Sequence, residues 1–89
     1  MKEMRELVST FHKKGMRVNL DVVFNHTYDV DSCCFNCVVP YYYYRYNEGG
    51  FLSNGSFCGN DFASDKPMAR RYLLYVISKM MDLYDVDGF

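Results

Sequence analysis

The sequence predicts an α/β fold in which helices alternate with parallel strands. Three observations lead to this prediction: an amphipathic N-terminal segment with helical spacing, a near-continuous apolar run after it, and a second helical segment that leads into another short apolar run. The predicted order is helix, strand, long loop, helix and strand. This order is typical of βα repeats, whose strands run parallel to one another.

The first helix is predicted over residues 2–14. Its apolar side chains recur at helical spacing and form one stripe, which consists of Met4, Leu7, Val8 and Phe11. Lys13 and Lys14 lie where the helix dipole is negative, and Gly15 follows as a natural C-terminal stop. His12 is interpreted as a surface residue of this helix. The segment carries no apolar signal-peptide core, so we expect no secretion signal if the native chain begins here.

The first strand is predicted over residues 17–24. Its apolar residues hardly alternate with polar ones, which is typical of a parallel strand covered on both faces. Asp21 lies inside this run, and a buried carboxylate is costly unless it is paired. The run ends at Asn25 and His26, where the chain leaves the apolar segment. We interpret Asp21, Asn25 and His26 together as members of a site.

Residues 25–65 are predicted to form one long loop. Turn-forming residues are frequent in it, among them Pro40, Gly49, Gly50, Asn54, Gly55 and Gly59. Loops of this length in a compact domain are usually functional or disordered. The many tyrosines and phenylalanines of this loop argue against disorder, because aromatic side chains gain from packing. The sequence therefore indicates a functional loop.

The second helix is predicted over residues 66–84. Ser64 or Asp65 suits its N-cap, and Pro67 suits its first turn. A long apolar stripe indicates core packing; it consists of Tyr72, Leu73, Val76, Ile77, Met80 and Tyr84. Residues 85–89 are predicted to begin another strand. Two strands alone do not make a stable parallel sheet, so the pattern predicts further chain on both sides.

Composition limits the classes of function. The 89 residues suffice for at most one small domain, and the net charge of −1 gives no electrostatic basis for binding nucleic acid or an anionic membrane. No apolar run approaches the roughly 18 residues of a membrane span. The sequence thus predicts neither nucleic acid nor membrane as a partner, and it leaves the compartment open.

The four cysteines leave one alternative open. Cys33, Cys34 and Cys37 are clustered, and Cys58 follows later in the same loop. Zinc requires four ligands, which these thiols could supply. The alternative is therefore a small, zinc-stapled binding module. Free, partly buried thiols are the simpler interpretation.

Several segments resemble a known family of enzymes. Residues 21–27, with the sequence DVVFNHT, resemble the first signature region of the α-amylase-type glycoside hydrolases, and residues 86–89 (VDGF) resemble the opening of their second region. Residues 39–46 and 52–64 resemble the type I pullulanase, or debranching, branch. The resemblance covers essentially the whole chain. It implies that residues 1–89 are an internal fragment of the catalytic domain of such an enzyme.

By this resemblance the fold is a partial (β/α)8 TIM barrel. Its implied elements are the second barrel helix at 2–14, the third strand at 17–24, the long loop at 25–65, the third helix at 66–84 and the start of the fourth strand at 85–89. Active sites of such barrels form at the C-terminal ends of the strands. Asn25 and His26 lie at such an end.

The resemblance also implies roles for individual residues. His26 is expected to hydrogen-bond the sugar at the cleavage subsite, and Asp21 to orient its neighbours, including an arginine of the second region. Asn25 is expected to bind substrate and hold the loop, and it is a weak calcium candidate because one oxygen does not make a calcium site. Tyr28 is the best single candidate for stacking on a sugar ring, while most of tyrosines 41–46 are expected to pack the loop. Asn60 and Asp61 either contact sugar hydroxyls or cap the following segment.

The implied chemistry is retaining hydrolysis of α-1,6 glucosidic branches. The implied partners are pullulan, amylopectin, glycogen-type glucans and limit dextrins, and calcium is the only cofactor considered for the full-length enzyme. The nucleophilic aspartate is expected just after Phe89 and the acid/base later, so the chain alone is predicted to be inactive. Isoamylase, branching enzyme and α-amylase are the alternatives within the family.

Overall fold

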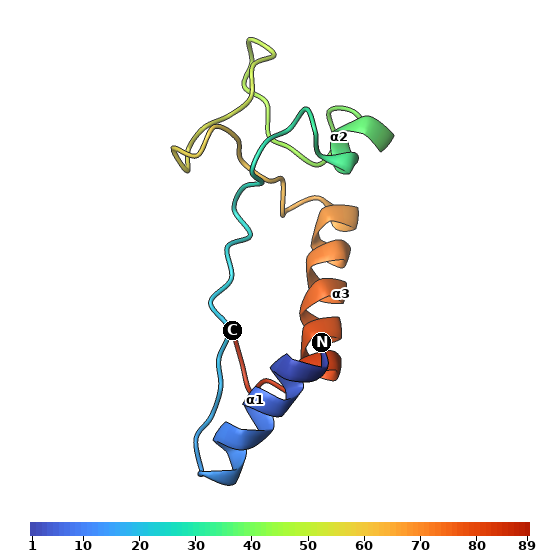
Figure 1. Cartoon of the computed structure of the whole chain (residues 1–89). Helices are drawn as coiled ribbons and strands as arrows, with labels where there is room; N and C mark the ends of the chain where they lie inside the picture. The colour runs from blue at the N-terminus through green and yellow to red at the C-terminus, as the bar shows by residue number, and fades with distance from the viewer. The chain divides into compact units, whose positions relative to one another are not determined.

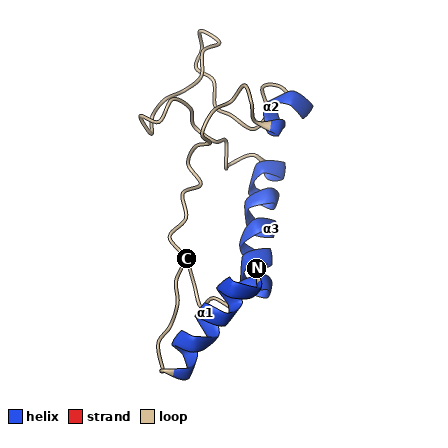
Figure 2. Ribbon diagram, in the orientation of Figure 1, coloured by secondary structure: helices blue, strands red, loops and turns tan.

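The computed structural model describes all 89 residues and contains three helices joined by loops and turns (Figures 1 and 2). Helix α1 spans Lys2–Lys13, α2 spans Cys34–Val38 and α3 spans Pro67–Tyr84. Both helices that the sequence predicts are therefore present, and α2 is a short helix inside the predicted loop. None of the three is long and apolar enough to cross a lipid bilayer.

The chain divides into two compact units. Unit 1 consists of Met1–Val22 and Leu74–Phe89, and unit 2 consists of Val23–Leu73. Unit 2 thus contains the whole predicted loop, residues 25–65, together with the first residues of α3.

The predicted fold class is wrong for this chain, because no strand forms (Figure 2). Over residues 17–24 the backbone makes a single parallel bridge, between Asn19 and Gly88. The other two bridges, Tyr44 with Phe62 and Tyr46 with Leu52, are isolated and antiparallel. A strand requires a ladder of hydrogen bonds to neighbours on the sheet, and one short pairing does not sustain it. The structure is therefore mostly coil with few helices, and not a partial (β/α)8 barrel.

In unit 1, α1 ends as its sequence predicts. The Gly15 N–H donates to the carbonyl of His12 over 2.9 Å, and Gly15 takes a φ of 75° that favours glycine. Val8 is completely buried, whereas Leu7 is 52% exposed. The predicted apolar stripe is thus only partly covered.

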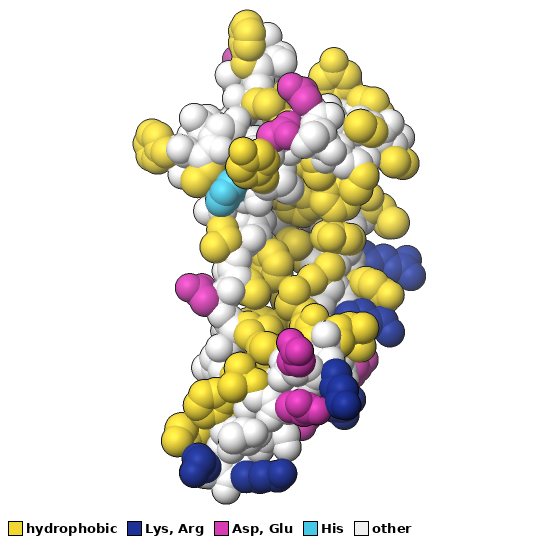
Figure 3. Space-filling view, in the orientation of Figure 1, with side chains coloured by type: hydrophobic (Ala, Val, Ile, Leu, Met, Phe, Trp, Pro, Cys, Tyr) yellow, Lys and Arg dark blue, Asp and Glu magenta, His cyan; other side chains and the backbone are white.

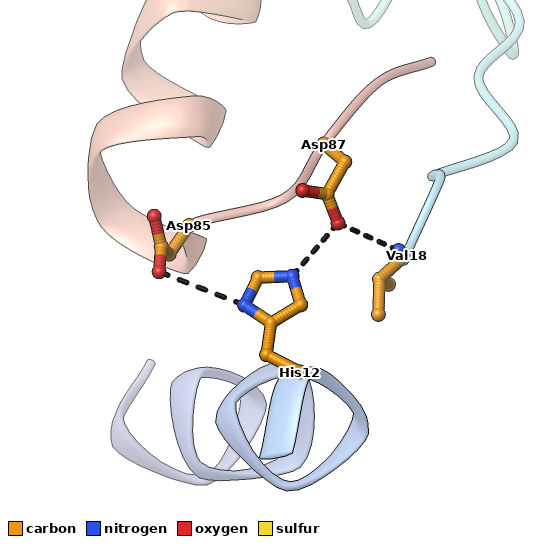
Figure 4. A network of polar contacts seen from close by, with 4 residues as sticks. All are labelled: His12, Val18, Asp85 and Asp87. Carbon is orange, nitrogen blue, oxygen red and sulfur yellow. Dashed lines mark hydrogen bonds and ion pairs between the residues drawn. The ribbon is translucent and has the colours of Figure 1, made fainter. Parts of the chain in front are cut away.

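His12 joins α1 to two other segments of unit 1, as Figure 4 shows. Its Nε2 lies 2.7 Å from Oδ2 of Asp87, and its Nδ1 lies 3.9 Å from Oδ2 of Asp85. The same Asp87 oxygen accepts a hydrogen bond from the Val18 N–H over 2.8 Å. The Val18 amide and, next, His12 hold the pKa of Asp87 below its usual range. His12 is therefore more than the surface residue that the sequence suggests.

Unit 2 has an aromatic core. Val30, Tyr44, Phe62 and Ala69 are buried together, and partly buried Cys33, Phe35, Tyr43, Tyr46, Leu52 and Leu73 pack against them. The Phe35 ring stacks on Tyr43 at 4.7 Å between centroids and meets the edge of Tyr72 at 4.8 Å. The long loop thus folds around its own aromatic side chains, as its composition predicts.

Many apolar side chains stay on the surface. Hydrophobic atoms occupy much of the face shown in Figure 3, and Leu74, Tyr75 and Val23 are each about 60% exposed. Exposed apolar surface of this extent is unusual for a small soluble domain.

Candidate functional site

A buried asparagine fixes the backbone directly after His26. Asn60 is only 2% exposed. Its Nδ2 donates to the carbonyl of Thr27 over 2.9 Å, and its Oδ1 accepts from the Thr27 N–H over 3.0 Å. On the other side of His26, the carbonyl of Asn25 accepts from the Phe62 N–H over 2.8 Å. The backbone is therefore held on both sides of the histidine.

A buried tyrosine supports the same segment. The Thr27 hydroxyl donates to the carbonyl of Asp29 over 3.1 Å and lies 2.8 Å from the Tyr44 hydroxyl. Because the single Thr27 proton is used, Tyr44 is the donor of the second bond. Burial raises the pKa of Tyr44 to about 12, so the phenol keeps its proton at neutral pH. Thr27 is thus held by its side chain as well as by its backbone.

Asn25 and His26 form a hydrogen-bonded pair. Nδ1 of His26 lies 2.7 Å from Oδ1 of Asn25. An amide oxygen only accepts, so Nδ1 carries a proton. In the neutral ring Nε2 then keeps a lone pair, which can accept a hydrogen bond from a hydroxyl group; in the protonated ring Nε2 donates. His26 is half-buried and Asn25 is exposed. The pair is suited to binding a polar ligand.

Backbone hydrogen bonds pair residues 43–45 with residues 61–63 beside the site. The Arg45 N–H donates to the carbonyl of Asp61 over 2.9 Å, and the Ala63 N–H donates to that of Tyr43 over 2.7 Å. Because Phe62 also bonds to Asn25, the segment 61–63 connects the histidine backbone to the tyrosine run. The hydrophobic core of unit 2 lies under this pairing, since Tyr44 and Phe62 belong to it.

The Asp61 carboxylate organises the turn before this segment. It accepts hydrogen bonds from the Ser53 hydroxyl at 2.7 Å, the Gly55 N–H at 2.7 Å and the Ser56 N–H at 2.9 Å. The bond from Ser53, followed by those from the two amides, holds the pKa of Asp61 well below its usual range. The side chains of Asn60 and Asp61 are thus engaged with earlier residues of the chain, and neither caps the segment that follows them.

A pocket of about 360 Å³ lies beside this pairing. Its lining includes Asn25, Arg45, Ser56 and Asp61. Asn25 therefore faces a hollow of the surface, whereas His26 is not among the lining residues.

The other two predicted site residues make no polar contact. Tyr28 is 99% exposed. Asp21 is exposed and forms no hydrogen bond or ion pair, so the burial that its apolar neighbours suggest is not found. The physical reason is that the strand which would have enclosed Asp21 does not form.

The predicted metal ligands do not converge. All four cysteines are free thiols, and three of them, Cys34, Cys37 and Cys58, are exposed. No three His, Cys, Asp or Glu side chains come together in a way that could hold a metal ion. Oδ1 of Asn25 already accepts from His26. The residues present therefore fit neither the zinc staple nor a calcium site.

The sequence did not single out Thr27 and Tyr44, whose hydroxyl groups contact each other next to His26. Thr27 stands at the end of the signature-like segment, so its position was a usable signal. Tyr44 is one of four consecutive tyrosines, and no local pattern distinguishes the buried one from its neighbours.

The chain is similar to known debranching enzymes over nearly its whole length. It is 42% identical over 87 residues to the pullulanase of Bacillus subtilis (strain 168), which covers 98% of this chain and 12% of that protein. It is 33% identical over 95 residues to the chloroplastic isoamylase 3 of Oryza sativa subsp. japonica, which covers 99% of this chain and 12% of that protein. No protein-family model matches the chain.

A solved structure agrees with these relatives. The chain superposes on a pullulanase from Paenibacillus barengoltzii, crystallised with maltohexaose and α-cyclodextrin, with a TM-score of 0.93 and 41% identity. The match covers 98% of this chain and 14% of that one. The chain thus spans about an eighth, namely 12%, of the length of the Bacillus subtilis pullulanase and of the rice isoamylase.

Proposed function

The chain corresponds to a segment of the pullulanase-type debranching enzymes, and from this premise we propose that it supplies substrate-binding residues to an enzyme that hydrolyses α-1,6 glucosidic branches. The observation that carries the proposal is the hydrogen-bonded Asn25–His26 pair, in which Phe62 holds the backbone of Asn25 and Asn60 holds that of the following residue, Thr27. Preorganised hydrogen-bonding groups of this kind bind a sugar without first having to be ordered.

The identities favour pullulanase over the other branches. The Bacillus subtilis pullulanase is 42% identical to this chain, whereas the rice isoamylase is 33% identical over a similar length. The Paenibacillus barengoltzii pullulanase was crystallised with maltohexaose and α-cyclodextrin. Both ligands are α-glucans, which supports an α-glucan such as pullulan or amylopectin as the partner of the parent enzyme.

His26 is proposed to contact the sugar at the cleavage subsite. Its Nδ1 is occupied by Asn25, so Nε2 is the nitrogen that meets the substrate. The neutral ring accepts a hydrogen bond from a sugar hydroxyl, and the protonated ring donates to a sugar oxygen. Asn25 is a positioning residue for the ring in this account, in addition to lining the pocket beside it.

Tyr28 and Asp21 keep their predicted roles as parts of the proposal. The Tyr28 ring is almost fully exposed, which leaves both of its faces free to pack against the C–H face of a sugar. Asp21 is proposed to pair with an arginine of the parent enzyme, because it has no partner among residues 1–89.

The proposed reaction uses two carboxylates in retaining hydrolysis. One attacks the anomeric carbon while the protonated form of the other delivers its proton to the leaving oxygen. Neither group is assigned to a residue of this chain. We therefore expect residues 1–89 alone to release no sugar from pullulan.

A chimera tests the proposal. The 87 matched residues of the Bacillus subtilis pullulanase are replaced by the corresponding residues of this chain. We expect the chimera to hydrolyse pullulan, measured as released reducing ends, with the parent enzyme as control. A chimera that is folded by circular dichroism and inactive on pullulan contradicts the proposal.

A further inference from the structure

A second pocket of unit 2 has no role in the proposed site. Its volume is about 440 Å³, and its lining includes Tyr41, Arg45, Tyr46, Asn47, Asp65 and Lys66. It shares only Arg45 with the pocket that Asn25 lines. Volumes of this order are typical of sites for small molecules.

Tyr41 combines a strained backbone conformation with an exposed ring. Tyr41 has a φ of 62°, in the left-handed region that bulky residues avoid, and it is 71% exposed. Its N–H donates to Oδ1 of Asn36 over 3.3 Å, and its ring meets that of Tyr46 at 5.1 Å between centroids. Core packing does not account for a strained residue that is mostly in solvent. Strained residues held in this way are frequent where a ligand binds.

The charged groups that line the pocket are already engaged. The Arg45 guanidinium lies 2.7 Å from the Asp65 carboxylate, and the Lys66 ammonium lies over the Tyr42 ring at 5.0 Å from its centroid. The Arg45–Asp65 pair is neutral as a whole, and the Lys66 ammonium lies over an aromatic ring, so the lining is compatible with a neutral polar ligand.

The remaining lining groups suit a sugar. Oδ1 of Asn47 accepts from the N–H groups of Gly49 and Phe51, so its Nδ2 is the amide group free to donate. Two aromatic rings and an amide donor match the C–H face and the hydroxyls of a pyranose.

We propose that this pocket binds one glucosyl unit of the α-glucan, through the Tyr41 and Tyr46 rings and the Asn47 amide. It is a second contact for the same polymer, separate from the cleavage subsite assigned to His26. The identity of the sugar rests on the proposed function, whereas the location of the pocket does not.

The test uses the 89-residue chain with His26→Ala, so that the proposed cleavage subsite no longer contributes. Maltotriose is the probe, and its binding is followed by saturation-transfer difference NMR, which observes the ligand. We expect saturable binding to this variant. Adding Tyr41→Gly removes the ring and also relieves the positive φ, so the fold is kept; we expect affinity to fall at least about fivefold. Adding Tyr41→Phe, which keeps the ring, should change affinity by less than about twofold.

A control variant makes the comparison decisive. Adding Phe57→Ala, at a residue that is 91% exposed and lies outside the pocket, should leave maltotriose binding unchanged. No binding to the His26→Ala chain, or equal binding with and without Tyr41→Gly, overturns the pocket assignment. Neither result affects the proposed function, which is tested by hydrolysis in the chimera.

Discussion

Asn60 is the residue whose loss should most directly loosen the backbone at His26. Asn60→Ala removes both hydrogen bonds to Thr27, and we expect it to lower the free energy of unfolding of unit 2 by about 2 kcal/mol. Amide exchange at Thr27 should accelerate accordingly. Ser64→Ala is the matched control, since Ser64 is exposed and its hydroxyl makes no hydrogen bond. Equal effects of the two substitutions would show that the hydrogen bonds from Asn60 to Thr27 do not stabilise unit 2.

Asp61 makes the stability of the loop dependent on pH. Its pKa in the folded chain is depressed, because Ser53 and two backbone N–H groups bond to the charged form. The stability that it contributes is therefore fully present above the ordinary pKa of about 4 and is lost as the pH falls toward the lower folded value. We expect Asp61→Asn to destabilise unit 2 at pH 7, and the difference from the unsubstituted chain to shrink between about pH 4 and pH 2. Thermal unfolding at several pH values measures this, and a constant difference would refute it.

Part of the site could be predicted at the scale of residues. Asn25 and His26 follow an apolar run and match a signature-like segment, so the sequence marks both as site candidates. The sequence does not show their mutual hydrogen bond. It also does not show the bonds from Asn60 to Thr27, because these residues are 33 positions apart along the chain. Contacts of that kind depend on how the loop folds back on itself.

At the scale of elements, His12 connects α1 to the segments around Val18 and Asp87. We expect His12→Ala to lower the Tm of unit 1, because Asp87 then loses its partner at 2.7 Å. Ser9→Ala on the exposed face of α1 is the control, with little expected change. Since the pKa of Asp87 is lowered, this contribution should be present above about pH 4 and vanish as the pH falls further. A Tm that does not respond to His12→Ala would show that the pair contributes nothing.

Helices were predictable from the sequence, whereas strands were not. The spacing of apolar residues in α1 and α3 is an internal property of each segment, and both helices form close to their predicted ends. A strand instead needs partners, and residues 17–24 find only one bridge, to Gly88. Helix α2 escaped prediction because five residues are too few to show a period.

On the scale of the whole molecule, the two units should differ in stability. Unit 2 contains the cluster of Val30, Tyr44, Phe62 and Ala69, whereas the buried hydrophobic residues of unit 1 are Val8 and Val86. We expect amides of residues 23–73 to exchange more slowly than those of residues 1–22, and unfolding to lack a single sharp transition. Hydrogen exchange with mass spectrometry measures this. A sharp, cooperative transition of the monomer, with equal protection in both units, would contradict the expectation.

The resemblance in the sequence predicted the relatives correctly and the fold class wrongly. Local residue patterns, such as residues 21–27 and 52–64, suffice to indicate a branch of debranching enzymes. A closed sheet is a property of many segments together, and its formation cannot be inferred from the pattern of two of them.

The most direct test of the account concerns His26 in the chimera with the Bacillus subtilis pullulanase. We expect His26→Ala to lower kcat/KM on pullulan by about 10²- to 10³-fold, as is typical when one donor to the transition state is lost. Phe57→Ala, at a residue 91% exposed, should leave kcat/KM nearly unchanged. An unchanged kcat/KM for His26→Ala in a folded chimera would show that His26 does not contact the reacting sugar.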